Sequence, residues 1–184
     1  SLHDALPIFR LIGDLAHGTL NAGGTLDASA PQGGDGGFIE TSAATVNMAD
    51  TLAVTTLAPH GATGTLLVDP NNYTVAASGG NATGASFTSL INSNNVTIST
   101  ASYGTAGGSG DIFINDTITK TAASGTTSLT FLAERNIAVN SSITSTGGPL
   151  NITLSAANAA AGTLGGVRVA SSQTLNSNGG DILI

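Results

Sequence analysis

A short pattern of alternating apolar residues recurs in the second half of this chain. It reads IFINDTIT at residues 112–119, IAVNSSIT at 137–144 and, more loosely, VRVASS at 167–172, so the copies begin 25 and then 30 residues apart. Each period holds several short strand-like runs with tight turns between them and no helical pattern. A single repeat of this length cannot bury its own apolar side, so neighbouring copies must stack. The spacing therefore predicts an all-β solenoid of the parallel β-helix type.

In a parallel β-helix, each coil lies about 4.8 Å from the next, so equivalent residues form columns. Asn115 and Asn140 share a place at a corner of the repeat, and we expect their side-chain amides to form a ladder. The alternative is that each is only a turn residue. Ala170 interrupts this column in the third copy.

Side chains along a strand face alternate sides, so each run also predicts which residues form the core. Residues 150, 152 and 154 are Leu or Ile and are expected to point inwards, whereas the polar residues 151, 153 and 155 face solvent. Val139 is expected to share an interior column with Ile114 and Val169.

The composition narrows the classes of protein to which this chain can belong. Charged residues make up only 8% of the chain and aromatic residues 4%, whereas 40% are hydrophobic. This hydrophobic content and the alternation argue against disorder, and we expect a narrow core of Ile, Leu, Val and Ala. The net charge is −7 and the four basic residues are scattered, which argues against nucleic-acid binding. No apolar run is long enough to span a membrane, and the absence of cysteine excludes disulfides.

Three segments of the chain differ in pattern. Residues 1–8 (SLHDALPI) resemble one reading frame of a sequencing-library adapter, and we expect them to be a non-native leader. Residues 9–17 carry no clear pattern, and residues 18–184 form the predicted β-helix. The pattern looks cut at both ends, so we expect a segment of a longer protein.

Turn signals separate the predicted strands. The glycines within residues 33–37 indicate a sharp turn, and Asp69 before Pro70 indicates an Asx turn. Two longer polar stretches, residues 78–89 and 99–110, are predicted to be loops. The glycine-rich stretches have neither the spacing of a calcium-binding repeat nor the Lys-Ser/Thr of a phosphate loop, so no cofactor is predicted.

Few residues have the arrangement of a catalytic site. Parallel β-helices include polysaccharide lyases and hydrolases, whose sites need clustered acids together with Lys or Arg. In this chain Arg135 adjoins Glu134, which suggests a local ion pair, and Arg168 stands alone on a small polar face. We therefore predict no catalytic residue and keep a carbohydrate-active enzyme as an alternative.

Histidine and asparagine offer the remaining candidate sites. The histidines share no metal-ligand spacing with one another or with a carboxylate, so no metal site is predicted at His3, His17 or His60. The triplet Asn-x-Ser/Thr marks candidate N-glycosylation sites, and it occurs at Asn72, Asn81, Asn95, Asn115, Asn140 and Asn151. A composition this rich in Asn, Ser and Thr produces such triplets by chance, which makes each a weak candidate.

Several phrases, in order, resemble the large exoproteins of the filamentous-haemagglutinin type, of which the high-molecular-weight adhesins are one branch. They are GGFIETS (36–42), TGTLLVDP (63–70), NNVTI (94–98), GDIFIND (110–116) and RNI (135–137). The resemblance covers roughly residues 18–184. Leu66 departs from it, because relatives often carry Trp there, and local packing is expected to differ.

The resemblance implies a right-handed parallel β-helix, secreted to the surface of a Gram-negative bacterium through a partner outer-membrane β-barrel transporter. The domain that the transporter recognises is not in this segment, and no catalytic residue carries over. We therefore expect a non-catalytic shaft that projects a distal region towards a host-cell receptor or glycan. The alternatives are a carbohydrate-active β-helix enzyme and a glycan-binding surface on the Ser/Thr/Asn face.

Overall fold

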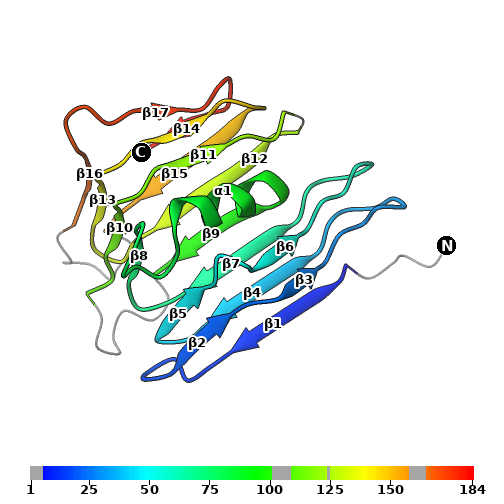
Figure 1. Cartoon of the computed structure of the whole chain (residues 1–184), viewed down its shortest axis with the longest axis horizontal. Coiled ribbons are helices and arrows are strands. Elements are labelled where there is room, and N and C mark those ends of the chain that lie inside the picture. Colours follow the sequence, from blue (N-terminus) through cyan, green and yellow to red (C-terminus); the bar gives the residue numbers. More distant parts are fainter. Residues whose placement is uncertain (1–5, 101–108, 124, 158–164) are drawn as a thin grey trace.

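The chain folds into a parallel β-solenoid of about six coils, as the repeat spacing predicts. The computed structural model describes residues 6–100, 109–123, 125–157 and 165–184. Every strand pairing among these residues is parallel. The coils stack in chain order from one end of the molecule to the other (Figure 1). The right-handed winding remains a prediction from the resemblance.

One side of the solenoid is a continuous seven-stranded sheet, with one strand from each of six coils and a seventh strand that follows the sixth coil. Its strands in spatial order are β1 (Ile8–Ile12), β4 (Phe38–Ser42), β7 (Thr65–Asp69), β9 (Asn95–Ser99), β12 (Thr127–Leu132), β15 (Leu150–Ser155) and β18 (Ile182–Leu183). We number the six coils from β1, β4, β7, β9, β12 and β15, where each begins.

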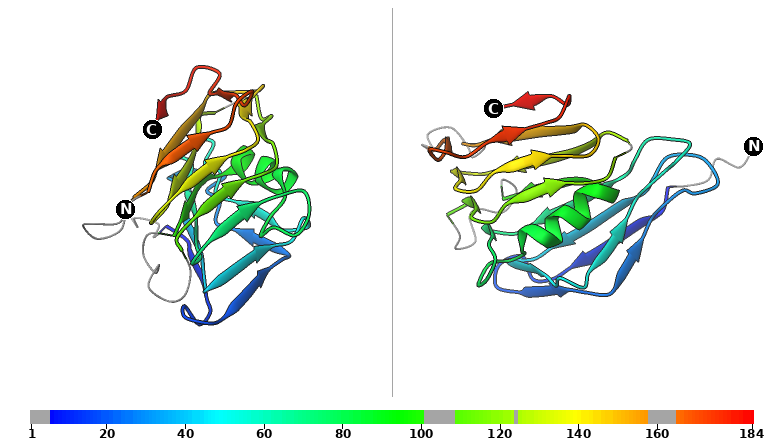
Figure 2. Two further views of the ribbon diagram at one scale, coloured as in Figure 1. Left: turned by 90° about the vertical axis from the view of Figure 1, so that its left-hand side faces the viewer. Right: turned by 45° about the horizontal axis from the view of Figure 1, so that its top comes forward.

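The other two sides are interrupted in the middle of the stack (Figure 2). On the second side β2 (Thr19–Ala22) pairs with β5 (Thr45–Met48), and a separate sheet joins β8 (Tyr73–Val75), β10 (Ile112–Ile114), β13 (Ile137–Val139) and β16 (Val167–Val169). On the third side β3 (Thr25–Asp27) pairs with β6 (Ala53–Thr55), and a separate sheet joins β11 (Ile118–Lys120), β14 (Ile143–Ser145) and β17 (Leu175–Asn176).

An α-helix fills the gap on the third side. Helix α1 (Gly84–Ser93) belongs to the third coil and lies between β6 and β11 (Figure 1). The loop predicted over residues 78–89 is therefore wrong in its second half. Thr83 caps the helix, because its hydroxyl accepts a hydrogen bond from the Ser86 amide at 3.1 Å. The buried residues Phe87, Leu90 and Ile91 recur at helical spacing and anchor one face in the core.

The predicted register of the repeats is confirmed. Ile112 pairs with Ile137, which pairs with Val167, and Ile114, Val139 and Val169 stack in one column as expected. Ile114 and Val139 are fully buried, but Val169, in the last coil, is 37% exposed rather than interior. Parity is also confirmed in β15, where residues 150, 152 and 154 are at most 1% exposed and the residues between them are half-buried.

The core is mostly aliphatic but not purely so. Tyr73, Phe87 and Phe131 are fully buried, which corrects the expected core of Ile, Leu, Val and Ala alone. The Phe87 ring lies 6.0 Å from that of Tyr73, edge to face, and 6.1 Å from that of Phe131, stacked. The third coil supplies Tyr73 and Phe87 and the fifth supplies Phe131, so the rings form a small aromatic cluster in the core beside α1.

The segment before residue 18 joins the solenoid. Strand β1 begins at Ile8 and pairs with β4, and the Pro7 carbonyl accepts a hydrogen bond from the Phe38 amide at 2.9 Å. Residues 9–17 thus supply an edge strand that their sequence does not signal. The origin of residues 1–8 stays a hypothesis, and residues 1–5 lie outside the described residues.

Two turn predictions have different outcomes. The glycine turn is confirmed, with Gly33 and Gly34 at φ values of +140° and +84°. The chain also turns after Asp69, but the Asn71 amide donates to the Ala44 carbonyl of the previous coil rather than closing an Asx turn. The loop predicted over residues 99–110 lies largely outside the described residues.

Candidate functional site

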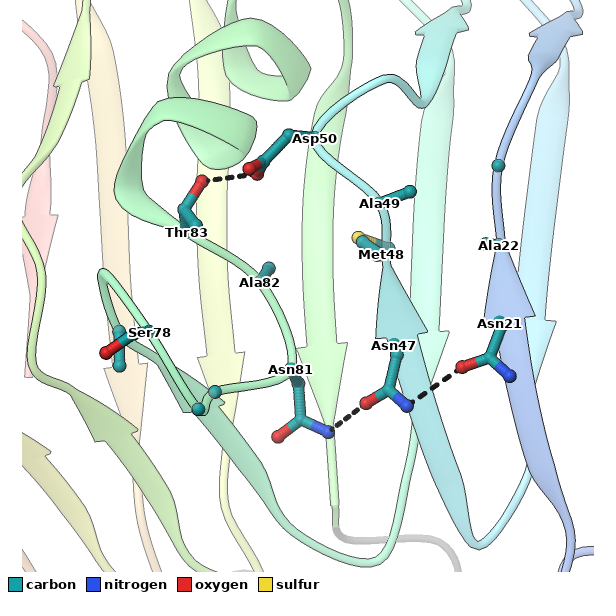
Figure 3. A pocket seen from close by; sticks show the side chains of 14 residues that line it. Asn21, Ala22, Asn47, Met48, Ala49, Asp50, Ser78, Asn81, Ala82 and Thr83 are labelled. Carbon is teal, nitrogen blue, oxygen red and sulfur yellow. Dashed lines mark hydrogen bonds between the residues drawn. The ribbon is translucent and has the colours of Figure 1, made fainter.

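A polar groove opens on the second side of the solenoid, where the third coil leaves the regular path. It has a volume of about 380 Å³ and lies beside the N-terminus of α1 (Figure 3). Three asparagines cross it in a row, Asp50 and Thr83 close one end, and residues 78–80 line one wall. Its floor consists of small or apolar residues, among them Ala22, Met48, Ala49 and Ala82.

The row of asparagines is a side-chain ladder across three coils. The Asn47 amide nitrogen donates to Asn21 Oδ1 at 3.0 Å, and the Asn81 amide nitrogen donates to Asn47 Oδ1 at 3.1 Å (Figure 3). Asn81 is held further by the Thr74 amide, which donates to its Oδ1 at 2.9 Å. The ladder is therefore fixed at Asn81, whereas the Asn21 side chain at its other end is exposed.

Sequence reasoning missed this ladder, although a signal was present. The runs TLNA at 19–22 and TVNM at 45–48 match in pattern, and they align residue for residue as β2 and β5. The link to Asn81 has no such signal. It depends on the path of the third coil.

The groove exists because the third coil passes along this side twice. After β8 the chain loops through residues 76–80 and returns, so that Ala82 bridges Val75 and the Asn81 carbonyl accepts from the Met48 amide at 2.8 Å. Gly79, at φ +70°, permits the sharp return. This loop forms a wall that a regular coil would not have.

The helix end of the groove holds one ordered carboxylate. Asp50 Oδ1 accepts hydrogen bonds from the hydroxyls of Thr83 at 2.7 Å and Ser86 at 2.5 Å. These bonds, that of Ser86 foremost, lower the pKa of Asp50, so the group is ionised at neutral pH. A second carboxylate, Asp116, accepts from the Gly84 amide at 2.8 Å outside the groove. Both acids satisfy the positive N-terminus of α1.

A different carboxyl is buried at the corner between β7 and β8. Asp69 is 5% exposed, and its Oδ1 has no hydrogen-bond partner among the described residues. Burial, together with the nearby charge of Glu40, raises the pKa of Asp69 to about 6. Asp69 is enclosed and a substrate cannot reach it. Its raised pKa is therefore not a sign of a catalytic role.

All four basic side chains are described, and each has a partner. Arg10 pairs with Glu40 at 3.2 Å, and the buried Lys120 donates from Nζ to the Ala122 carbonyl at 3.1 Å. Burial lowers the pKa of Lys120. None of the four lines the groove.

The expected local pair of Arg135 and Glu134 is wrong. Arg135 instead forms a two-pronged ion pair with Asp111 of the previous coil, Nε to Oδ1 at 2.9 Å and Nη2 to Oδ2 at 2.5 Å. This pair, with hydrogen bonds from Ser109 and Asn136, lowers the pKa of Asp111 to about 2. Stacking of the coils brings these residues, 24 positions apart in the sequence, into contact.

The predicted ladder of Asn115 and Asn140 is confirmed, and Arg168 extends it. The Asn140 amide nitrogen donates to Asn115 Oδ1 at 2.8 Å. Arg168 Nη1 donates to Asn140 Oδ1 at 3.0 Å, so this arginine does not stand alone as expected. Its long side chain takes the position that Ala170 cannot fill.

The glycosylation triplets lie in unequal surroundings. Three of the six side-chain amide nitrogens already donate hydrogen bonds, those of Asn81, Asn95 and Asn140. The side chains of Asn72, Asn115 and Asn151 accept hydrogen bonds through Oδ1. Of the six, only Asn115 is exposed, so it is the most accessible candidate, and the prediction of glycosylation stays open.

His17 and His60 belong to no group of three or more metal-ligating side chains within the described residues, and His3 lies outside them. In the same part of the chain no helix is long and apolar enough to cross a bilayer.

A scan against protein-family models, a search of curated proteins and a search of solved structures each gave no significant match.

Proposed function

We propose that this chain is a shaft segment of a large secreted bacterial exoprotein of the adhesin type. One observation carries the proposal: the continuous seven-stranded sheet, which links every coil to the next along the whole stack. Each coil adds about 4.8 Å to the length of such a stack, so coils added in series extend a rigid rod. The function is mechanical, to hold a distal binding region away from the cell surface.

The use of polar groups also supports a structural role. Amides and charged side chains tie successive coils to one another, as in the pairs of Asn140 with Asn115 and of Arg135 with Asp111. A carbohydrate-active enzyme is a weaker alternative, because an acidic polysaccharide needs a free cation and each of the four basic side chains is engaged. A glycan-binding surface is the second alternative and does not conflict with a shaft.

Location in the source bacterium tests the proposal. Antibodies against this chain should label filaments on the cell surface or protein in the medium. Deletion of the outer-membrane β-barrel transporter encoded beside the full gene should remove that labelling, whereas deletion of an unrelated transporter should not. Labelling that stays inside the cell in the wild type would contradict both the shaft and its secretion route.

A further inference from the structure

We propose that the groove beside α1 binds an uncharged oligosaccharide. This inference goes beyond the shaft and does not depend on it. In a regular β-solenoid the outer faces are flat, and the groove forms only where the third coil doubles back through residues 76–80. A binding site is therefore added to the side of the stack without interrupting the seven-stranded sheet behind it.

Two polar groups of the groove, Asn21 and Asp50, are held in place and still have free hydrogen-bonding capacity. The Asn21 amide nitrogen, the Ser78 hydroxyl and the second oxygen of Asp50 have no hydrogen-bond partner among the described residues. Asn21 is positioned by Asn47, and Asp50 by Thr83 and Ser86. Together these groups offer donors and one strong acceptor around the rim of the groove (Figure 3).

The floor between these groups is small and apolar. Ala49 is exposed there, and Ala22, Met48 and Ala82 lie beneath it with at most 5% of their surface exposed. A pyranose ring combines a C–H face with a rim of hydroxyls, so its face fits such a floor while its hydroxyls reach the polar rim. An apolar floor with a few placed polar groups is the usual form of a small-molecule site.

The charge of the groove selects among sugars. Of its fourteen lining residues, all described, Asp50 is the only charged one. Asp50 stays ionised because hydrogen bonds lower its pKa, so it accepts hydrogen bonds from hydroxyls and repels carboxylates and sulfates. Uronic and sialic acids are thus disfavoured, and neutral hexoses are favoured.

The size of the groove sets the length of the ligand. The volume of about 380 Å³ is near the lower end of small-molecule sites, about 300–1,000 Å³. The ladder spans three strand positions, or about 10 Å, enough for two linked pyranose rings. No aromatic ring lines the groove, so we expect weak binding, in the millimolar range, that gains strength only when many copies act together.

Saturation-transfer NMR on the purified chain tests the proposal with four neutral disaccharides, maltose, cellobiose, lactose and diacetylchitobiose, and with digalacturonate and sialyllactose. At least one neutral sugar should bind at millimolar concentration, and neither acidic sugar should. Binding of acidic sugars alone, or of none of the six, would overturn the proposal.

Variants then locate the binding. Ala49→Trp fills the groove from an exposed position and should abolish binding, whereas Ala85→Trp, exposed on α1 and outside the groove, should leave it unchanged. Asn21→Ala and Asp50→Asn should each weaken binding about three- to tenfold, as expected for the loss of one hydrogen bond. Circular dichroism checks that each variant is folded. Binding that survives in folded Ala49→Trp would place the sugar elsewhere and refute the assignment.

Discussion

The fifth coil repeats the fourth closely in register, whereas the third coil matches its neighbours only through β7 and β8. In the fourth and fifth coils, β10 stacks on β13 and β11 on β14, and Ile or Val fills each interior column except the one that pairs Lys120 with Ser145. In the third coil, the second side is crossed twice and the third side is an α-helix. The third coil supplies one wall of the groove and holds the buried Asp69.

The difference shows two ways to complete a coil. A regular coil is stabilised by its own strands, which need only an alternating pattern and a neighbour. The third coil depends on single contacts from elsewhere, such as Asp50 from the second coil and Asp116 from the fourth, which both bind the N-terminal turn of α1. The regular coils therefore build the rod, and the irregular third coil adds the groove to its side.

The largest effect is expected from a charge placed inside a regular coil. Ile152 is 1% exposed, and Ile152→Asp would bury a carboxylate without a partner at a cost of several kcal/mol. Typical stabilities are about 5–15 kcal/mol, so we expect Ile152→Asp, and likewise Val139→Asp, to abolish folding. Thr153→Asp faces outwards and should change the free energy of unfolding by no more than about 0.5 kcal/mol.

Urea unfolding followed by circular dichroism measures these differences. Equal damage from Ile152→Asp and Thr153→Asp would mean that both faces of β15 are buried. The single-walled solenoid would then be the wrong description.

A smaller loss is expected from a cavity in the third coil. Phe87 is fully buried against Tyr73 and Phe131, and Phe87→Ala should cost about 3–5 kcal/mol. The matched control is Phe113→Ala, because Phe113 is 37% exposed on the outer face of β10 and should contribute little. Hydrogen exchange should show the loss of protection concentrated in α1. A loss spread evenly over β13 and β14 as well would mean that the third coil is not a separate unit of stability.

The sequence-based predictions were accurate for the regular coils and less accurate for the third coil. Columns in the regular coils depend on a pattern that is local and repeated, which is why the Asn115 and Asn140 ladder was predictable. Helix α1 was not, because GASFTSLINS is rich in residues of low helix propensity. Its stability comes from burial and from acids that lie more than 30 residues away in the sequence.

Electrostatic predictions failed for a related reason. Arg135 was assigned to its sequence neighbour Glu134, but the register places Asp111 beside it. The groove could not be predicted either, because it requires the return path of residues 76–80. In a solenoid, the residues that repeat can be recognised in the sequence. The places where the chain departs from the repeat are harder to recognise.

Two carboxyls in the third and fourth coils should give opposite pH dependence. The pKa of Asp69 is raised to about 6 in the folded chain, so between about pH 4 and pH 6 the folded state holds more protons than the unfolded state. Stability should therefore fall as pH rises through this window, by at most about 3 kcal/mol. Asp69→Asn should remove that decline.

Asp111 should act in the other direction. Its pKa is lowered to about 2 by Arg135, so it stabilises the fold above about pH 4 and the benefit is lost as pH falls towards 2. Allowing for the partly exposed guanidinium, 43% by side chain, we expect about 1–2 kcal/mol. Urea unfolding from pH 2 to pH 7 on wild type, Asp69→Asn and Asp111→Asn separates the two. If Asp69→Asn keeps the decline between pH 4 and pH 6, the buried carboxyl is not its cause.

The smallest effects are expected from the two asparagine ladders, which compare the regular coils with the groove most directly. Asn140→Ala and Asn47→Ala each remove a residue that donates to one neighbour and accepts from another. Both side chains are half-buried, so water replaces much of what is lost, and we expect about 0.5–1.5 kcal/mol for each. Thermal melts of the two variants should agree within error. The functional consequence should differ, because only Asn47 positions Asn21 in the groove. Asn47→Ala should weaken sugar binding and Asn140→Ala should not. If both variants weaken it equally, the ladders act through general stiffness of the stack, and the groove has no special role in recognition.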